Sequence, residues 1–229
     1  YYEQIVRRNA KRMNQANNWI VFVRGNHDNP AYFDGSIFNF KRFIAVPDYA
    51  ILQACNHTIL CVGGAISIDR VYRINEWNKR KYRIHSNEPQ EYDISRNLYW
   101  QNEAPVYNSD MMNAIHTSFL IDTVVTHTAP SHCELFSKSN LGQWTINDPS
   151  LIEDIQFERK TMDMLLHHLK TDSHPVSHWY YGHFHQSWHS AIDGILYQML
   201  ILWSSVKYID LYHFVYNIDT ISRIIPDRL

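Results

Sequence analysis

Apolar and polar positions along the chain form two recurring patterns, one typical of amphipathic helices and the other of buried strands. Residues 1–18 follow the helical pattern, and the apolar run WIVFV at residues 19–23 predicts a strand covered on both faces. Residues 49–69 predict a hairpin whose strands meet around Asn56 and His57, and whose second strand ends at Gly63 and Gly64. The missing side chains of this glycine pair permit a bulge or a close backbone approach.

Residues 69–106 show no clear period and predict a long irregular stretch. Because such loops are usually functional or disordered, and this one is rich in aromatic residues, we expect an ordered insertion. A helix is then expected from a cap at Ser109 to about Phe119, with Met111 and Ile115 on the same face as Phe119. The run FLIDTVV at residues 119–125 predicts another buried strand.

The last third of the chain predicts one long helix and further strands. Asp148 followed by Pro149 is typical of a helix start, with a capping side chain and then proline in the first turn. The apolar stripe of this helix consists of Ile152, Ile155, Met162, Leu166 and Leu169. Residues 195–203 and 208–218 predict strands. Helices and strands mixed in this order predict a single α/β sandwich domain over residues 1–229.

Two of the predicted strands run into polar clusters, which read GNHD at residues 25–28 and TH at 126–127, and a third polar cluster reads GHFH at 182–185. Open α/β sheets bind ligands at the carboxyl ends of their strands. Neutral imidazole is the commonest metal-binding side chain, and His183 and His185 would face the same way on extended backbone. Taken singly, each cluster is more simply explained as a turn, a strand end or a polar strand face. Their combination favours a metal site.

The segments GNHD, THTAP and GHFH resemble the last three motifs of the calcineurin-like metallophosphoesterases, and GGAISID at residues 63–69 is similar to a strand of many bacterial members. The resemblance spans about residues 19–203. It implies two facing mixed β-sheets flanked by helices, a four-layer sandwich with two divalent metal ions at the strand ends. The ions would be Mn, Fe, Zn or Ni.

The resemblance also implies roles for individual residues. The metal ligands would be Asn26, His127 and His183 on one ion and His185 on the other. His27 would be the catalytic histidine, which stabilises charge on the phosphate or protonates the leaving oxygen, while Asp28 supports the loop. The implied reaction is hydrolysis of a phosphomonoester or phosphodiester by a metal-activated water, a reaction that two adjacent cations promote well.

The first two motifs of that family, Asp-x-His and Gly-Asp-x-x-Asp, do not precede Gly25. In the family they supply the aspartates of the metal pair, and the remaining ligands carry no formal charge. Residues 1–229 alone are therefore not expected to hold two metal ions tightly and could be inactive, whereas the intact protein is expected to bind both. Either the chain lacks the N-terminal strand-helix-strand of a longer enzyme, or it is a degenerate relative that acts as a binding or scaffold protein. The opening in mid-helix without methionine favours the first interpretation. A third alternative is a single-zinc hydrolase that uses His127, His183 and His185.

The segment at residues 69–106 is rich in arginine and lysine among its aromatics. It could form a cap that recognises the substrate, with Arg70 and Arg73 as candidates for binding the phosphate. A solvated surface loop of balanced charge explains the composition equally well. Arg24, next to Gly25, is expected to pair with a carboxylate at the sheet end.

Composition narrows the partners. A formal net charge of -2 and a pI near 6.7 argue against a nucleic acid held by a basic surface, so nucleic acid is expected only as a substrate. No apolar run is long enough for a membrane helix. Cys55, Cys61 and Cys133 are odd in number and lack CxxC spacing, which predicts buried reduced thiols and a cytoplasmic location. The sequence does not indicate an oligomeric state.

Overall fold

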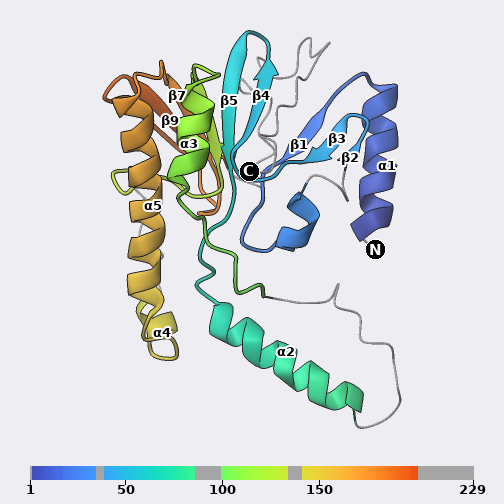
Figure 1. The fold of residues 1–229 in the computed structure, drawn as a ribbon. Coiled ribbons are helices and arrows are strands. Elements are labelled where there is room, and N and C mark those ends of the chain that lie inside the picture. The colour runs from blue at the N-terminus through green and yellow to red at the C-terminus, as the bar shows by residue number, and fades with distance from the viewer. Residues whose placement is uncertain (1, 35–38, 86–98, 134–140, 201–229) are drawn as a thin grey trace.

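The computed structural model of the chain describes residues 2–34, 39–85, 99–133 and 141–200, and its strands form two sheets (Figure 1). The small sheet has the order β1-β3-β2, with β1 (Ile20–Phe22) parallel and β2 (Asn39–Phe40) antiparallel to β3 (Phe43–Ala45). The large sheet has the order β4-β5-β6-β7-β9-β8. Its strands are β4 (Ala50–Ala54), β5 (His57–Val62), β6 (Thr123–Thr126), β7 (His178–Tyr181), β8 (Trp188–Ile192) and β9 (Ile195–Met199).

The two sheets pack face to face through a shared apolar layer. Ile44 and Val46, at the end of the small sheet, lie in one buried cluster with Leu52 of β4 and with Ile59 and Cys61 of β5. Successive strand residues point to opposite faces, so the neighbours of these residues on β4 and β5 face the other way, toward helices. The alternation in the sequence thus provides two apolar faces for one sheet.

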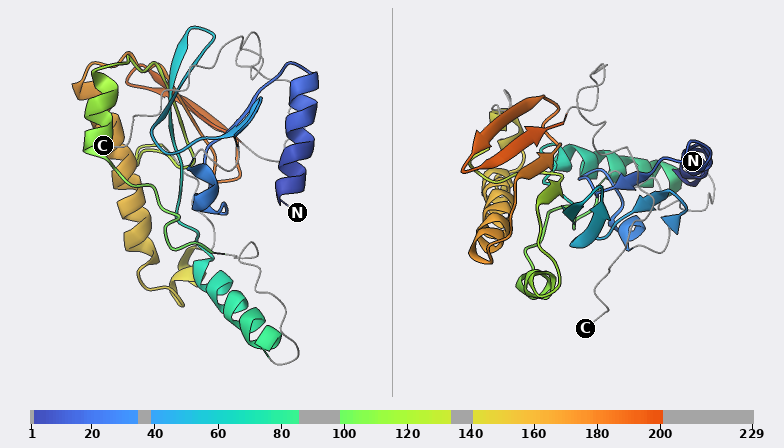
Figure 2. Two further views of the ribbon diagram at one scale, coloured as in Figure 1. Left: turned by 45° about the vertical axis from the view of Figure 1, so that its right-hand side comes forward. Right: turned by 90° about the horizontal axis from the view of Figure 1, so that it is seen from above.

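Helices cover both outer faces of this pair of sheets. On the small sheet, α1 (Tyr2–Gln15) buries Val6 and Ala10, one turn apart, against Phe43. On the large sheet, α3 (Ser109–His116) and α5 (Leu151–Thr171) cover a core that includes Trp179, which is fully buried. Burial of such a side chain stabilises the fold by about 1.5–3 kcal/mol. Figure 2 shows α1 and α5 on opposite sides of the sheets, so the predicted four-layer α/β sandwich is confirmed.

The parallel core of the large sheet brings distant parts of the chain to one edge. Strands β5, β6, β7 and β9 run parallel, with Val62 aligned to Thr126 and Val125 to Tyr180. The residues that follow β5, β6 and β7 therefore emerge on the same side. The end of β1 joins them, because the Gly64 N–H donates a hydrogen bond to Arg24 O at 2.7 Å.

The segment at residues 69–106 differs from its prediction. Instead of an irregular stretch, it opens with the helix α2 (Arg70–His85), which projects from the sandwich (Figure 1). Tyr72 and Ile74 are exposed, and none of residues 70–79, the part of α2 whose side chains are described, is buried. This part of α2 therefore lacks the buried stripe that reveals a helix in a sequence. Residues 86–98 of the predicted insertion lie outside the described part of the chain.

Several predicted boundaries were wrong by a few residues. The cap of α3 is Asn108, whose Oδ1 accepts from Met111 N at 3.0 Å, and α5 begins after Ser150 rather than at Asp148. Strand β6 begins at Thr123 instead of residue 119. Strand β1 is not covered on both faces, since Phe22 at its end is 43% exposed. The hairpin is confirmed, with Cys55 and Asn56 in its turn at positive φ, as two-residue hairpin turns require.

At the carboxyl end, β9 accounts for the first part of the predicted strand at 195–203, while residues 201–203 and the strand predicted at 208–218 lie outside the described residues. Two shorter helices complete the element order, a 3-10 helix at Pro30–Phe33 and α4 (Leu141–Thr145).

All three cysteines are free thiols, as predicted, and Cys61 and Cys133 are buried while Cys55 is partly exposed. Burial raises the pKa of both buried thiols to about 12, so neither is a ready nucleophile. Among the described helices, none combines the length and apolar composition that crossing a membrane requires.

Candidate metal centre

The loop after β1 presents Asn26 and His27 at the strand-end edge. The Asp28 carboxylate accepts the Gly25 N–H at 2.7 Å, so Asp28 supports the loop as expected. Gly25 does not lie at positive φ, so an unusual backbone conformation is not the reason for glycine at this position. It is needed for close approach instead, because a Cβ there would lie 3.1 Å from His127 Cε1. A missing side chain thus lets two segments meet.

Asn26, His127 and His183 come together from three different strand ends. The Asn26 Oδ1 lies 3.0 Å from His127 Nε2 although the two residues are 101 positions apart. The His127 and His183 rings meet edge to face with centroids 5.2 Å apart, and Gly182 N–H donates to His127 O at 3.2 Å. Asn26 is 5% exposed, so its amide is fixed by the protein rather than by solvent.

The GHFH segment has a different backbone from the one predicted. Strand β7 ends at Tyr181, and both His183 and His185 adopt positive φ, at 68° and 56°. The argument that alternate residues on extended backbone face the same way therefore does not apply to them. His185 is exposed, and its effect on His27 is electrostatic.

His27 pairs with an arginine from α2. An Arg73 guanidinium nitrogen lies 2.8 Å from His27 Nε2, while Arg73 Nε donates to Asp69 Oδ1 at 2.7 Å. Because arginine can only donate, His27 Nε2 is the acceptor in this contact. The pKa of His27 is lowered, mainly because burial disfavours the charged imidazole and secondly because of the positive charge of Arg73. Sequence reasoning named Arg73 but missed Asp69, although their i,i+4 spacing is typical of a helical ion pair.

Arg70, the other candidate for binding the phosphate, forms ion pairs with two aspartates of the α5 region instead. Its guanidinium donates to both Asp148 oxygens, at 2.5 and 2.9 Å, and to Asp154 Oδ2 at 2.5 Å. This ion pair ties α2 to the start of α5. It also explains why Asp148 does not cap α5, since its carboxylate serves Arg70.

The donor atoms at the strand ends suit a divalent metal ion. An amide oxygen and imidazole nitrogens are ligands for Mn, Fe, Zn or Ni, and Asn26 Oδ1 and His127 Nε2 already face each other. Within the described residues, the only group of three His, Cys, Asp or Glu whose ligand atoms lie within 4.8 Å of one another is His116, Asp172 and His174. His127, His183 and His185 do not form such a group, so the single-zinc alternative gains no support.

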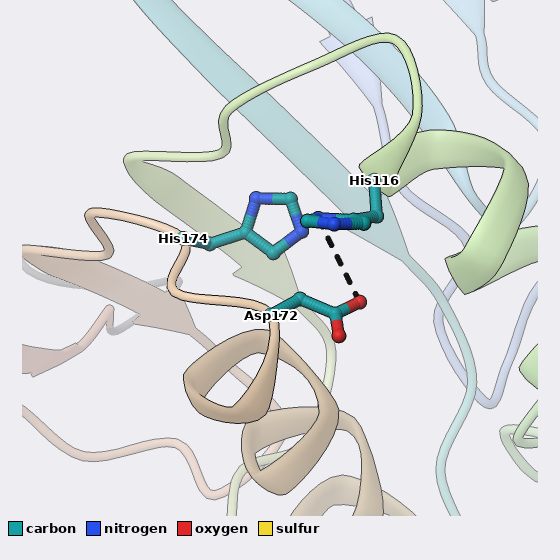
Figure 3. Close-up of side chains that lie close together, drawn as sticks. All are labelled: His116, Asp172 and His174. Carbon is teal, nitrogen blue, oxygen red and sulfur yellow. Dashed lines mark ion pairs between the residues drawn. The ribbon is translucent and has the colours of Figure 1, made fainter.

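The group of His116, Asp172 and His174 lies on the outer side of the large sheet and is drawn in Figure 3. His174 Nδ1 accepts the Ile121 N–H at 3.0 Å, so a neutral His174 carries its proton on Nε2, the nitrogen that faces His116 and Asp172. A protonated nitrogen has no lone pair for a metal. The cluster therefore does not qualify as a metal site, and its His116 Nδ1 to Asp172 Oδ2 distance of 3.8 Å indicates only a loose ion pair.

The two facing sheets, with amide and imidazole groups gathered at their strand ends, define an α/β protein of the metallophosphoesterase type. The sequence model described as Calcineurin-like phosphoesterase matches residues 1–187. The chain belongs to the calcineurin-like phosphoesterase family. Members of this family are metal-dependent hydrolases of phosphoesters, and they generally use divalent metal ions. No curated protein matches the sequence.

Proposed function

We propose that this protein hydrolyses a phosphomonoester or phosphodiester at the strand-end site, with a water molecule activated by divalent metal ions. The observation that carries the proposal is the meeting of Asn26 Oδ1 and His127 Nε2 at 3.0 Å, beside the ring of His183. Bound divalent ions offset the charge of a phosphate and lower the pKa of a bound water enough to give hydroxide near neutral pH.

The proposed site holds two such ions. Asn26, His127 and His183 would bind one, and His185 the other. Because these ligands carry no formal charge, a stable pair of dications requires carboxylates from outside this set. The catalytically inactive binding or scaffold protein remains the alternative, and the neutral ligand set is the feature that favours it.

His27 and Arg73 would act on the substrate. Their side chains are 2.8 Å apart, so a phosphate oxygen that reaches His27 lies within reach of the same guanidinium. Guanidinium groups bind phosphate through charge-assisted hydrogen bonds, whereas Arg70 is occupied by two aspartates. We therefore assign phosphate binding to Arg73, and to His27 the stabilisation of phosphate charge or the protonation of the leaving oxygen. With Arg73 on it, α2 would act as the described part of a substrate cap.

The test uses the intact protein, including any segment encoded before residue 1 that supplies such carboxylates, because residues 1–229 alone are not expected to hold two metal ions tightly. The metals are Mn²⁺, Fe²⁺, Zn²⁺ or Ni²⁺, and the substrates are p-nitrophenyl phosphate and bis(p-nitrophenyl) phosphate. Metal-dependent hydrolysis is expected, with two equivalents of metal per chain and loss of both metal and activity in His183→Ala. His167→Ala, which removes an exposed histidine of α5, is the matched control. Tight metal binding without hydrolysis of either ester would favour the scaffold alternative, and one equivalent with hydrolysis would favour a single-metal hydrolase.

A further inference from the structure

We propose that Glu103 is a positioning residue that acts through Ser67 to hold the Asn26 side-chain amide with its oxygen toward His127. The inference rests on the proposed function, in which Asn26 is a metal ligand. It adds two residues that sequence reasoning did not identify, since Ser67 lies in the GGAISID segment and Glu103 in the predicted insertion.

The three side chains form one buried chain of hydrogen bonds. Asn26 Nδ2 donates to Ser67 Oγ at 2.8 Å, and Ser67 Oγ donates to Glu103 Oε2 at 2.6 Å. The Ser67 N–H donates to the other carboxylate oxygen, Oε1, at 2.8 Å. Ser67 and Glu103 are each 1% exposed, so water does not compete for these groups. Buried polar groups in such networks have one favoured arrangement.

The donor-to-acceptor direction of these hydrogen bonds decides which end of the Asn26 amide faces the metal site. A carboxylate can only accept, so ionised Glu103 accepts the hydrogen bond that the Ser67 hydroxyl donates, and the lone pairs of Ser67 Oγ remain as acceptors. That acceptor attracts Asn26 Nδ2, and the amide oxygen then points the opposite way, to His127 Nε2. Only the oxygen of an amide can ligate a divalent ion, so a reversed amide would present a nitrogen with no available lone pair.

The backbone around Glu103 is fixed by groups that also hold the GNHD loop. Arg24 NH1 donates to Glu103 O at 2.9 Å. Arg24 NH2 pairs with Asp48 at 3.0 Å, so Arg24 has a carboxylate partner as expected, although the sequence did not indicate which one. Ala65 N–H donates to the same carbonyl at 3.0 Å. Gly64 lies at a φ of 93°, where a Cβ would come within 2.5 Å of Glu103 O. Glu103 is therefore held in place from two sides.

A carboxylate in this position is costly to the fold. Burial raises the pKa of Glu103 to about 7, although the hydrogen bonds from Ser67 oppose the shift. Perturbed carboxylates of this kind are concentrated at functional sites. Residues that orient a metal ligand through hydrogen bonds typically contribute about 10–100-fold to metal affinity or activity.

The matched control is Glu158, a second buried carboxylate that is 2% exposed. It accepts the N–H of Ile66, next to Ser67, and the hydroxyl of Thr128, next to His127. Glu158→Gln therefore removes a charge of the same kind, at similar depth, from a carboxylate that does not contact Ser67 or Asn26 in the described hydrogen bonds. A purely structural role for Glu103 predicts equal effects of the two substitutions.

The first measurement is made without metal. Side-chain amide hydrogen exchange of Asn26, followed by ¹⁵N NMR in the full chain, is expected to be slow in the wild type and in Glu158→Gln. It should be at least about tenfold faster in Ser67→Ala, which lacks the acceptor of the Nδ2 hydrogen bond, and in Glu103→Gln, in which the Ser67 hydroxyl no longer has to present a lone pair to Nδ2. The side chain of glutamine has one acceptor oxygen where glutamate has two, and its NH₂ group can donate to Ser67 Oγ. The Ser67 hydroxyl is then free to donate toward Asn26, which favours the reversed orientation of the Asn26 amide.

The second measurement is Zn²⁺ affinity by competition titration. We expect Glu103→Gln to weaken it at least about tenfold, with Glu158→Gln within threefold of the wild type. In an Asn26→Asp background, where both ends of the side chain are oxygens, Glu103→Gln should have no effect on affinity. Slow exchange of the Asn26 amide in Glu103→Gln, or equal loss of affinity in both backgrounds, would overturn the inference. A wild type that binds no metal refutes the proposed function, and the exchange measurement then decides the orientation by itself.

Discussion

Replacing Arg70 with alanine removes the cation that holds α2 to the start of α5. Arg70 donates to both oxygens of Asp148, whose side chain is 8% exposed, and its own side chain is 12% exposed. The contact with Asp154 is more open, at 40% exposure of the carboxylate. The substitution therefore leaves one buried carboxylate without its main partner.

The expected loss follows from that burial. Removing one member of a buried ion pair costs about 3–5 kcal/mol, while the exposed contact with Asp154 adds about 0–1 kcal/mol. Hydrogen bonds from Arg70 lower the pKa of Asp148 below its ordinary value. A carboxylate with a lowered folded pKa contributes stability above its unfolded pKa, about 3.9, and loses it as the pH falls through the folded value. The difference in unfolding free energy between the wild type and Arg70→Ala should therefore become smaller in acid.

Urea denaturation at pH 7 and near pH 3 measures both effects. Lys79→Ala, which breaks a surface pair with Glu76 in which the lysine is 65% exposed, is the control and should change the unfolding free energy by about 1 kcal/mol or less. Adding Asp148→Asn to Arg70→Ala should recover part of the loss, since the buried carboxylate that lost its partner is then neutral and only the more exposed Asp154 remains without Arg70. A loss below about 1 kcal/mol at pH 7 in Arg70→Ala would refute the reasoning.

Three further predictions follow from the same geometry. His27→Ala should retain metal but lower kcat by about 10²–10⁴-fold on an alkyl phosphate, and unchanged turnover would contradict its role. Gly63→Ala places a Cβ 2.6 Å from Arg24 Cβ and should cost about 1–3 kcal/mol in urea denaturation, so wild-type stability would show that the strands are not held this closely. The pKa of His174 is lowered by burial, so stability should fall as the pH drops below about 6.5, where the unfolded chain gains a proton that the folded chain excludes. The urea midpoint should fall less between pH 7 and pH 5 in His174→Gln than in the wild type. An equal fall in the two proteins would contradict a buried, neutral His174 ring.

The other groups around His174 act in opposite directions on its pKa. The charges of His116 and His168 lower it and the charge of Asp172 raises it. His168 Nε2 lies 3.1 Å from Asp172 Oδ2, so this carboxylate is shared between its neighbours. The pH dependence therefore belongs to the cluster, and the His174 variant isolates the part that comes from the buried ring.

The strand-end clusters could be predicted because they depend on local pattern. An apolar run followed by polar residues predicts a strand that ends at a sheet edge, and parallel strands place such ends together. That reasoning located Asn26, His127 and His183 near one another before any coordinates. It failed on the conformation of His183 and His185, because positive φ is uncommon for residues other than glycine, and histidine adopts it too rarely for the sequence to predict it at a given position.

The different partners of Arg70 and Arg73 could not be predicted in the same way. The two residues lie less than one helical turn apart, and their sequence contexts are equally basic. Which one meets His27 depends on the rotation of α2, and that rotation is fixed by Asp148, which lies 78 residues further along the chain. An exposed helix also lacks the apolar stripe that reveals its existence.

The sequence by itself determined the α/β class, the strand ends that carry the metal-ligand candidates, and membership of the family, because these follow from short-range periodicity and from motifs of contiguous residues. Only the tertiary structure decided that Glu103 and Ser67 orient Asn26, that Arg73 rather than Arg70 reaches His27, and that His174 is closed to metal. Those outcomes depend on which atoms donate and which accept across long stretches of chain, and the direction of a hydrogen bond is set by the folded neighbours of each residue.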